Sequence, residues 1–348
     1  MTSRNPVLPM RLLPVALLAL ATPALAQQSA TLPTFPITEW ETPWDPKDLI
    51  RDPVADDQGR IWFCGMLGNF IGLFEPGTGK FKRYELPAGT IPHNVIVDRQ
   101  GRAWLSGNRN GTINRIDPAS GVVTPYKLPE GLTDPHTMAL DSRDDIWFTV
   151  ARGNAVGKLD TKSGMMRIVK LPAPGSGPYG LVVDKLDRPW FAEFGTNKVG
   201  TVDPVTFTLR EFTLPNADSR PRRIALADGK VWVDDYPRGM LIRLDPANGT
   251  TTEFALPGGK QSLPYAMAAD DKGLVWVAET GLRPNQLTAF DTRTNKFVSV
   301  TPVTQSGGMT IRHMTFDPRT KSIWFATDAG TVGKLAVAGL GSGEQMRP

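Results

Sequence analysis

Short segments with alternating hydrophobic and polar residues follow one another along the chain after its first 26 residues. One stretch contains four of them, at 92–98 (PHNVIVD), 103–105 (AWL), 111–117 (GTINRID) and 123–129 (VTPYKLP). Turn-forming residues separate these segments, which is typical of short β-strands. A helix would need apolar residues at a 3.6-residue period over ten or more positions, and no segment after residue 26 has that pattern. The pattern predicts an all-β protein.

The four-strand unit recurs seven times, and a tryptophan marks each copy. The intervals between these tryptophans are 42, 43, 43, 42, 44 and 48 residues. They are Trp62, Trp104, Trp147, Trp190, Trp232, Trp276 and Trp324. A repeat of about 40–50 residues with a fixed tryptophan is typical of propeller blades. We therefore predict a seven-bladed β-propeller with four-stranded blades, as a single domain over residues 27–348.

The two ends of the repeat region complement each other. The last unit ends near residues 333–335 after only three strands, whereas residues 37–43 (ITEWETP) have the pattern of the missing outer strand. Pairing the two would close the ring and leave no open edge. We predict an N-terminal strand that closes the last blade.

Residues 1–26 have the pattern of a secretory signal peptide. Arg4 and Arg11 supply positive charge, residues 12–20 are apolar, and Ala24-Leu25-Ala26 is a small-x-small cleavage pattern. The alternative is a stable hydrophobic N-terminal helix. The apolar core is too short to span a bilayer. We expect cleavage after Ala26, a periplasmic or secreted protein, and no membrane span.

The mature chain is nearly neutral. The full chain has a formal net charge of +4, and removing two arginines and no acid leaves +2. No cluster of lysine or arginine stands out, so a nucleic-acid partner is not expected. We expect a monomer whose partner is a small molecule or a cyclic peptide at the mouth of the channel.

Large polar or aromatic residues occupy one position of every repeat. Counting back eleven residues from each tryptophan, or ten in the fifth repeat, gives Arg51, His93, His136, Tyr179, Arg222, Tyr265 and His313. All three histidines of the chain are in this set. Innermost strands of a propeller converge on its channel, so we predict a ring of ligand-binding side chains there. Alternatively, each side chain only fills the channel and bonds to a neighbouring backbone group.

A second repeated position lies three residues after each tryptophan. In the fourth, fifth and sixth repeats it is an acid, namely Glu193, Asp235 and Glu279. Carboxylates on consecutive blades could hold a divalent cation or face a basic ligand group. The alternatives are solvated loop acids, or acids neutralised by Arg222.

Residues 177–184 (GPYGLVVD) and 189–200 (PWFAEFGTNKVG) resemble the repeat of the virginiamycin B lyase family. The resemblance extends over nearly the whole mature chain. It implies a seven-bladed propeller that opens a cyclic depsipeptide at its ester bond by elimination, with Mg²⁺ present.

The resemblance also implies roles for particular residues. The family pattern has a ring histidine on one blade and Glu-x-His on the next, matched here by His93 and by Asp134-Pro135-His136. A further glutamate is expected where this chain has Val150. The resemblance implies His136 as the base, since imidazole titrates near neutral pH. It further implies that His93 donates to the departing or bridging oxygen and that Asp134 holds Mg²⁺.

Two other functions remain open at this point. One is a non-catalytic periplasmic propeller that binds a ligand or another protein, and the other is a lactonase-like hydrolase. A serine nucleophile has no support, because the sequence contains no Gly-x-Ser-x-Gly motif.

Overall fold

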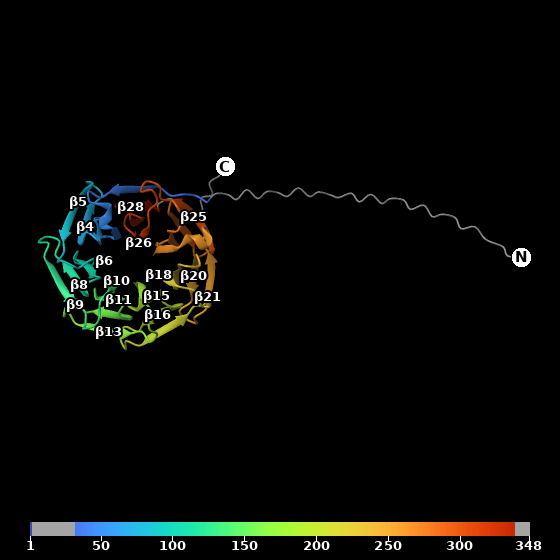
Figure 1. The fold of residues 1–348 in the computed structure, drawn as a ribbon, viewed down its shortest axis with the longest axis horizontal. Coiled ribbons are helices and arrows are strands. Elements are labelled where there is room, and N and C mark those ends of the chain that lie inside the picture. Colours follow the sequence, from blue (N-terminus) through green and yellow to red (C-terminus); the bar gives the residue numbers. More distant parts are fainter. Residues whose placement is uncertain (2–31, 338–348) are drawn as a thin grey trace. The chain divides into compact units, whose positions relative to one another are not determined.

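Seven four-stranded antiparallel sheets surround a central channel in the computed structural model, which describes Met1 and residues 32–337 (Figure 1). The innermost strands of consecutive sheets contact one another, and the last contacts the first. The ring is therefore closed, and the predicted seven-bladed β-propeller is confirmed.

Each sheet is one blade, and its strands run in order from the channel to the rim. The innermost strands are β2 (Ile50–Ala55), β6 (Pro92–Val97), β10 (Pro135–Leu140), β14 (Pro178–Val183), β18 (Pro221–Ala227), β22 (Pro264–Ala269) and β26 (Ile311–Asp317). The second strands are β3 (Ile61–Gly65), β7 (Ala103–Gly107), β11 (Ile146–Val150), β15 (Pro189–Glu193), β19 (Lys230–Asp235), β23 (Leu274–Glu279) and β27 (Ser322–Thr327). The third strands are β4 (Phe70–Glu75), β8 (Thr112–Ile116), β12 (Ala155–Leu159), β16 (Lys198–Val202), β20 (Met240–Leu244), β24 (Gln286–Asp291) and β28 (Thr331–Ala336). The outer strands are β5 (Lys80–Glu85), β9 (Val123–Lys127), β13 (Met166–Lys170), β17 (Leu209–Thr213), β21 (Thr251–Ala255), β25 (Lys296–Pro302) and β1 (Ile37–Glu41). Two short 3-10 helices, Pro46–Asp48 and Gly259–Ser262, lie in loops.

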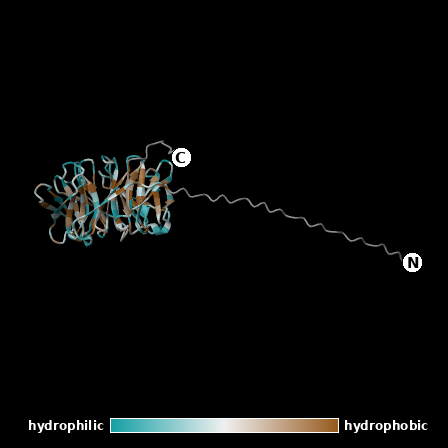
Figure 2. Cartoon of the chain, turned by 90° about the horizontal axis from the view of Figure 1, so that it is seen from above, coloured by the Kyte–Doolittle hydropathy of each residue, from teal (hydrophilic) through white to brown (hydrophobic). Residues whose placement is uncertain are grey.

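The hydrophobic core lies between neighbouring blades. The repeated tryptophans are buried in the second strands, and a typical cluster joins Trp62 of one blade to Val95 and Leu105 of the next. Both faces of each sheet are covered in this arrangement, so the second strands are hydrophobic on both faces. In Figure 2 hydrophobic residues gather within the strands, and hydrophilic residues are frequent at the loops.

The N-terminal strand closes the ring, as predicted. β1 pairs with β28 from Ile37 opposite Leu335 to Glu41 opposite Thr331. Trp40 on β1 stacks on Trp324 with ring centroids 5.8 Å apart. Sheet 7 is therefore built from both ends of the described chain.

An aspartate fixes the tryptophan in four of the blades; it is buried in two of them and half-buried in the other two. Asp98, at the end of β6, accepts hydrogen bonds from the indole of Trp104 (2.8 Å), from the Arg102 guanidinium (2.6 Å) and from two turn N–H groups. Three other pairs repeat the indole bond, namely Asp56 with Trp62, Asp184 with Trp190 and Asp270 with Trp276.

Replacing Asp98 by alanine should lower the free energy of unfolding by about 2–4 kcal/mol, because the buried indole N–H and turn N–H groups lose their acceptor. Thermal unfolding measures this loss. Asp117→Ala is a matched control, since Asp117 also accepts turn N–H groups but is solvent-exposed. Equal melting temperatures for the two variants would contradict this role of Asp98.

The predicted signal peptide, residues 1–26 with cleavage after Ala26, lies outside the described residues apart from Met1. Within the described part of the chain, no helix is both long and apolar enough to cross a bilayer.

Candidate functional site at the channel mouth

A β-bulge interrupts the pairing of each innermost strand near its start. It spans two residues in blades 2, 3, 4, 5 and 7, Asp52 and Pro53 in blade 1, and Tyr265 alone in blade 6. In blade 2 the pairing of β6 with β7 shifts between Pro92 and Val95, so His93 and Asn94 form the bulge. A bulge leaves a backbone N–H without a ladder partner. The Ser106 hydroxyl accepts the Asn94 N–H at 3.0 Å.

In blades 3 and 5, other side chains accept the backbone N–H groups that the bulge leaves without a ladder partner. Thr149 accepts the N–H of Thr137 at 3.1 Å. Asp234 accepts the N–H groups of both Arg222 and Arg223, at 3.1 and 2.6 Å. Side chains on the second strands therefore hold the bulges in place, and with them the residues at the channel.

The bulges create two layers of side chains across the channel. We call the first the mouth ring; it consists of Arg51, His93, His136, Tyr179, Arg222, Tyr265 and Arg312. We call the second the inner layer; it consists of Asp52, Asn94, Thr137, Gly180, Arg223, Ala266 and His313. These memberships follow from the strand registers of the seven blades.

The placement of His313 in the ring was wrong by one residue. The residue after the repeated tryptophan is Leu105 in blade 2, where it pairs with Val95, and Phe325 in blade 7, where it pairs with Met314. His313, directly before Met314, therefore corresponds to the second bulge residue, and Arg312 takes the ring position. The turn between β26 and β27 is one residue longer than in most blades, so a constant count back from Trp324 misses the ring.

Three aromatic rings of the mouth ring lie in a row, and each is tilted against the next, by 44° between His93 and His136 and by 47° between His136 and Tyr179. The ring centroids of His93 and His136 are 3.7 Å apart, and those of His136 and Tyr179 are 3.8 Å apart. The Tyr179 and Tyr265 hydroxyls are hydrogen-bonded at 2.7 Å. The Arg222 guanidinium lies 3.4 Å from the Tyr265 ring centroid, a cation–π contact.

These contacts close the mouth of the channel with side chains. His93 and His136 are only 5% and 3% exposed, and Arg51 is 3% exposed. Six of the seven predicted ring residues therefore meet at the mouth, where they contact one another instead of lining an open pocket. Their ligand-binding role stays a prediction.

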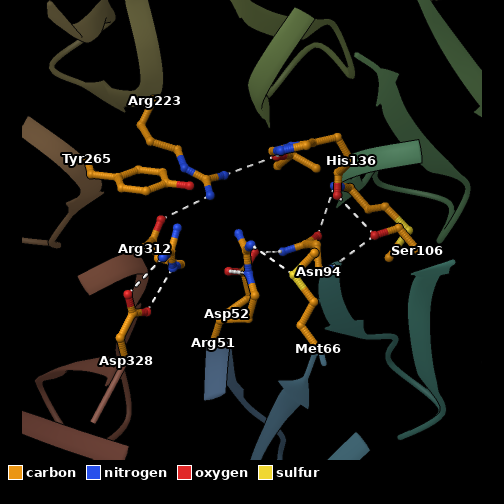
Figure 3. Close-up of polar contacts among 12 residues, drawn as sticks. Arg51, Asp52, Met66, Asn94, Ser106, His136, Arg223, Tyr265, Arg312 and Asp328 are labelled. Carbon is orange, nitrogen blue, oxygen red and sulfur yellow. Dashed lines mark hydrogen bonds and ion pairs between the residues drawn. The ribbon is translucent and has the colours of Figure 1, made fainter. Parts of the chain in front are cut away.

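The guanidiniums of Arg51, Arg222, Arg223 and Arg312 give the two layers a positive charge, and Figure 3 shows those of Arg51, Arg223 and Arg312. Arg51 pairs with Asp52 at 2.9 Å and Arg312 with Asp328 at 2.8 Å. Arg222 and Arg223 form no ion pair within the described residues. A terminal nitrogen of Arg51 and the Nε atoms of Arg222 and Arg223 are buried without a hydrogen-bond partner there.

The surrounding charge and the burial set the protonation of the site. Burial lowers the pKa of His136 well below its usual value, and the guanidiniums of Arg223 and Arg51 lower it further. Burial, Arg51 and His136 lower the pKa of His93 in the same way. Burial raises the pKa of Tyr265, but nearby guanidiniums outweigh it and bring the pKa to about 7. Both imidazoles are therefore neutral at pH 7.

The three repeated acids are buried within their own blades and do not face one another. Glu193, Asp235 and Glu279 are fully buried, so they are not solvated loop acids. Their side-chain donors include, in order, Thr196, Arg238 and Ser262. Burial and the neighbouring Glu211 carboxyl raise the pKa of Glu193 to about 7. Each acid secures a loop of its own blade.

The donors expected to hold Mg²⁺ do not gather at the mouth. Asp134 contacts the amide of Asn108 and the backbone N–H of Arg152, and no contact joins it to either imidazole in the described structure. Val150 is fully buried where the family pattern expects a glutamate. Among the described residues, no three His, Cys, Asp or Glu side chains form a possible metal site. The residues present therefore do not fit a resident magnesium ion.

Sequence reasoning missed the inner layer and Arg312. Asp52, Asn94, Thr137 and Arg223 each follow a ring residue, but only a bulge makes two consecutive residues share one side of a strand. The one available signal was the longest interval, 48 residues, before Trp324. It indicated that the last repeat departs from the common spacing.

The fold and the mouth define a seven-bladed propeller with a cationic, histidine-containing channel. The model of the virginiamycin B lyase family matches residues 46–287, and the chain belongs to this family. Among solved structures, virginiamycin B lyase from Staphylococcus aureus is 25% identical, with a TM-score of 0.79 over 87% of this chain and 99% of that one.

Two further solved structures agree with this relationship. A streptogramin B lyase is 25% identical, with a TM-score of 0.78 over 86% of this chain and 97% of that one. A catalytically inactive histidine-to-alanine variant of the Staphylococcus aureus enzyme, with quinupristin, is also 25% identical, with a TM-score of 0.78 over 87% of this chain and 99% of that one. No curated protein sequence matches this chain.

Proposed function

We propose that this protein is an exported carbon–oxygen lyase that opens a cyclic ester or depsipeptide by elimination. One observation carries the proposal: two neutral imidazoles, His93 and His136, contact each other at the mouth beside guanidiniums with unpaired nitrogens. Membership of the virginiamycin B lyase family supports the class of reaction. The pattern of residues 1–26 supports export to the periplasm or the medium.

The elimination needs a base and a partner for the departing oxygen. His136 removes the proton from the carbon next to a carbonyl, a C=C bond forms, and the C–O bond to the ester oxygen breaks. The ester oxygen leaves as part of a carboxylate. A neutral imidazole is able to take the proton at pH 7. His93 lies beside His136 and orients it.

Guanidiniums supply the positive charge that the reaction requires. The unpaired nitrogens of Arg51 and Arg222 are donors for the enolate-like oxygen and for the departing carboxylate. Arginine binds a carboxylate through paired N–H groups, and it needs no metal ligand to do so. We therefore assign the electrophilic role to these arginines, and the proposed reaction has no step that requires Mg²⁺.

A ligand-binding propeller without catalysis is the second candidate, and the closure of the mouth favours it. Both imidazoles are almost fully buried, so a substrate reaches them only when ring side chains move. Tyr179, Arg222 and Arg312 are partly exposed and form the accessible part of the ring. A binding protein would use this accessible part alone.

Incubation with quinupristin and measurement of the product mass separate the candidates. Elimination gives a linear product with the mass of the substrate, whereas lactonase-like hydrolysis adds one water. We expect a linear product of unchanged mass. Binding without any linear product would favour the second candidate, and a product heavier by one water would favour hydrolysis.

A further inference from the structure

A cavity lies beyond the inner layer, on the side away from the mouth. It has a volume of about 540 Å³ and is lined by the later residues of the innermost strands. Its walls are mainly apolar and include Ile96, Ala139, Val182, Leu226 and Phe316. These wall residues are partly exposed to solvent, so the cavity opens at the far end of the channel.

The floor of this cavity is polar, in contrast to its walls. Asn94, Thr137, Arg223 and His313 of the inner layer line it. Arg223 is 2% exposed, and its terminal nitrogens donate to the Thr137 hydroxyl and to the Arg312 carbonyl oxygen, both at 3.0 Å. The Nε of Arg223 and the Nδ1 of His313 are buried without a partner among the described residues. A buried polar nitrogen without a partner destabilises the protein, and a ligand that bonds to it removes that cost.

The floor has an excess of positive charge. The nearby carboxylate of Asp52 is already bound by Arg51 and by the Asn94 amide. Arg223 forms no ion pair within the described residues. Burial raises the pKa of Asp234 to about 7, so this carboxyl only partly offsets the guanidinium. One uncompensated guanidinium at the closed end of an apolar channel favours a ligand with a single negative charge.

We propose that this far channel binds an amphipathic monocarboxylate, with the carboxylate on Arg223 and the apolar chain along the walls. The volume is within the range of about 300–1,000 Å³ common for small-molecule sites. A single guanidinium suits one carboxylate, and apolar walls stabilise a hydrocarbon chain by burial. The inner layer forms the floor of the site and the mouth ring lies on its other side, so the proposal does not depend on the lyase function.

Calorimetric titration with decanoate, below its micelle-forming concentration, tests the proposal on the full chain. The neutral 1-decanol and the cationic decylamine have the same chain and a different head. We expect saturable binding of one decanoate per chain, at least tenfold tighter than binding of either analogue. Equal affinity for all three, or no binding of decanoate, would overturn the proposal.

Variants locate the head group. Arg223→Leu should weaken decanoate binding at least tenfold, whereas Arg223→Lys should stay within about fivefold of the wild type. Arg210→Leu removes the same charge from the exposed outer strand β17 and should change nothing. Unchanged binding in Arg223→Leu would contradict the assignment. If Arg223→Leu does not fold, two other results test the assignment. One is the affinity of Arg223→Lys for decanoate relative to the wild type, and the other is the order of affinities for the three head groups.

Discussion

Deleting residues 36–43 should lower the melting temperature by roughly 10–20 °C. The deletion removes β1. The hydrogen bonds between β1 and β28 and the contact of Trp40 with Trp324 are lost with it. Burial of one large aromatic side chain contributes about 2–3 kcal/mol, and loss of a whole strand costs about twice that. In a chain of this size, 1 kcal/mol shifts the melting temperature by about 2–4 °C. The exposed edge of β28 should also promote aggregation.

Two point variants on β1 keep this prediction testable if the deletion prevents folding. Trp40→Ala removes the partly buried indole that packs on Trp324, and we expect about 2–3 kcal/mol of destabilisation. Thr38→Ala is the control, because Thr38 is exposed on the same strand. A deletion or a Trp40→Ala variant that melts like the wild type would show that β1 does not close the ring.

Replacing His136 by alanine should lower turnover of quinupristin about 10²–10⁴-fold, the usual contribution of a positioned base. His136 lies between the rings of His93 and Tyr179, so the alanine variant has no imidazole at this position. His93 is the nearest other imidazole. We do not expect it to replace His136 fully as the base, because it lies beside the position of the His136 ring and not in it. Initial rates of formation of the linear product measure the effect.

Destabilisation alone must be separated from loss of the base. Asp98→Ala is the matched control, because Asp98 lies at the other end of the innermost strand β6 and, within the described residues, its hydrogen bonds go to Arg102, Trp104 and the turn and not to a ring residue. Assayed below its melting temperature, it should keep wild-type turnover. Turnover that survives in His136→Ala, or that is lost equally in Asp98→Ala, would remove His136 as the base.

The tryptophan repeat predicted the fold because each blade buries the same indole in the same strand. Trp62 and its six counterparts are all buried there. The closing strand was also predictable, since the last repeat lacks a fourth strand and an edge needs a partner. The sequence period therefore predicts those packing contacts that are the same in every blade.

The candidate site was less predictable because it depends on backbone detail. His93 and His136 meet as expected, but His313 lies in the inner layer because its blade has a longer turn. Arg223 was missed since a bulge, and not the sequence period, places it at the channel. Glu193 looked like a ligand by position, yet it is fully buried within its own blade and accepts a hydrogen bond from Thr196.

The most direct test of the arginine-assisted elimination is turnover of quinupristin by protein treated with excess EDTA, compared with protein in Mg²⁺. We predict a linear product of unchanged mass, formed at the same rate in both samples, and loss of that product in Arg51→Leu. A product that forms only with Mg²⁺, or no product in either sample, would contradict this account of the mouth ring.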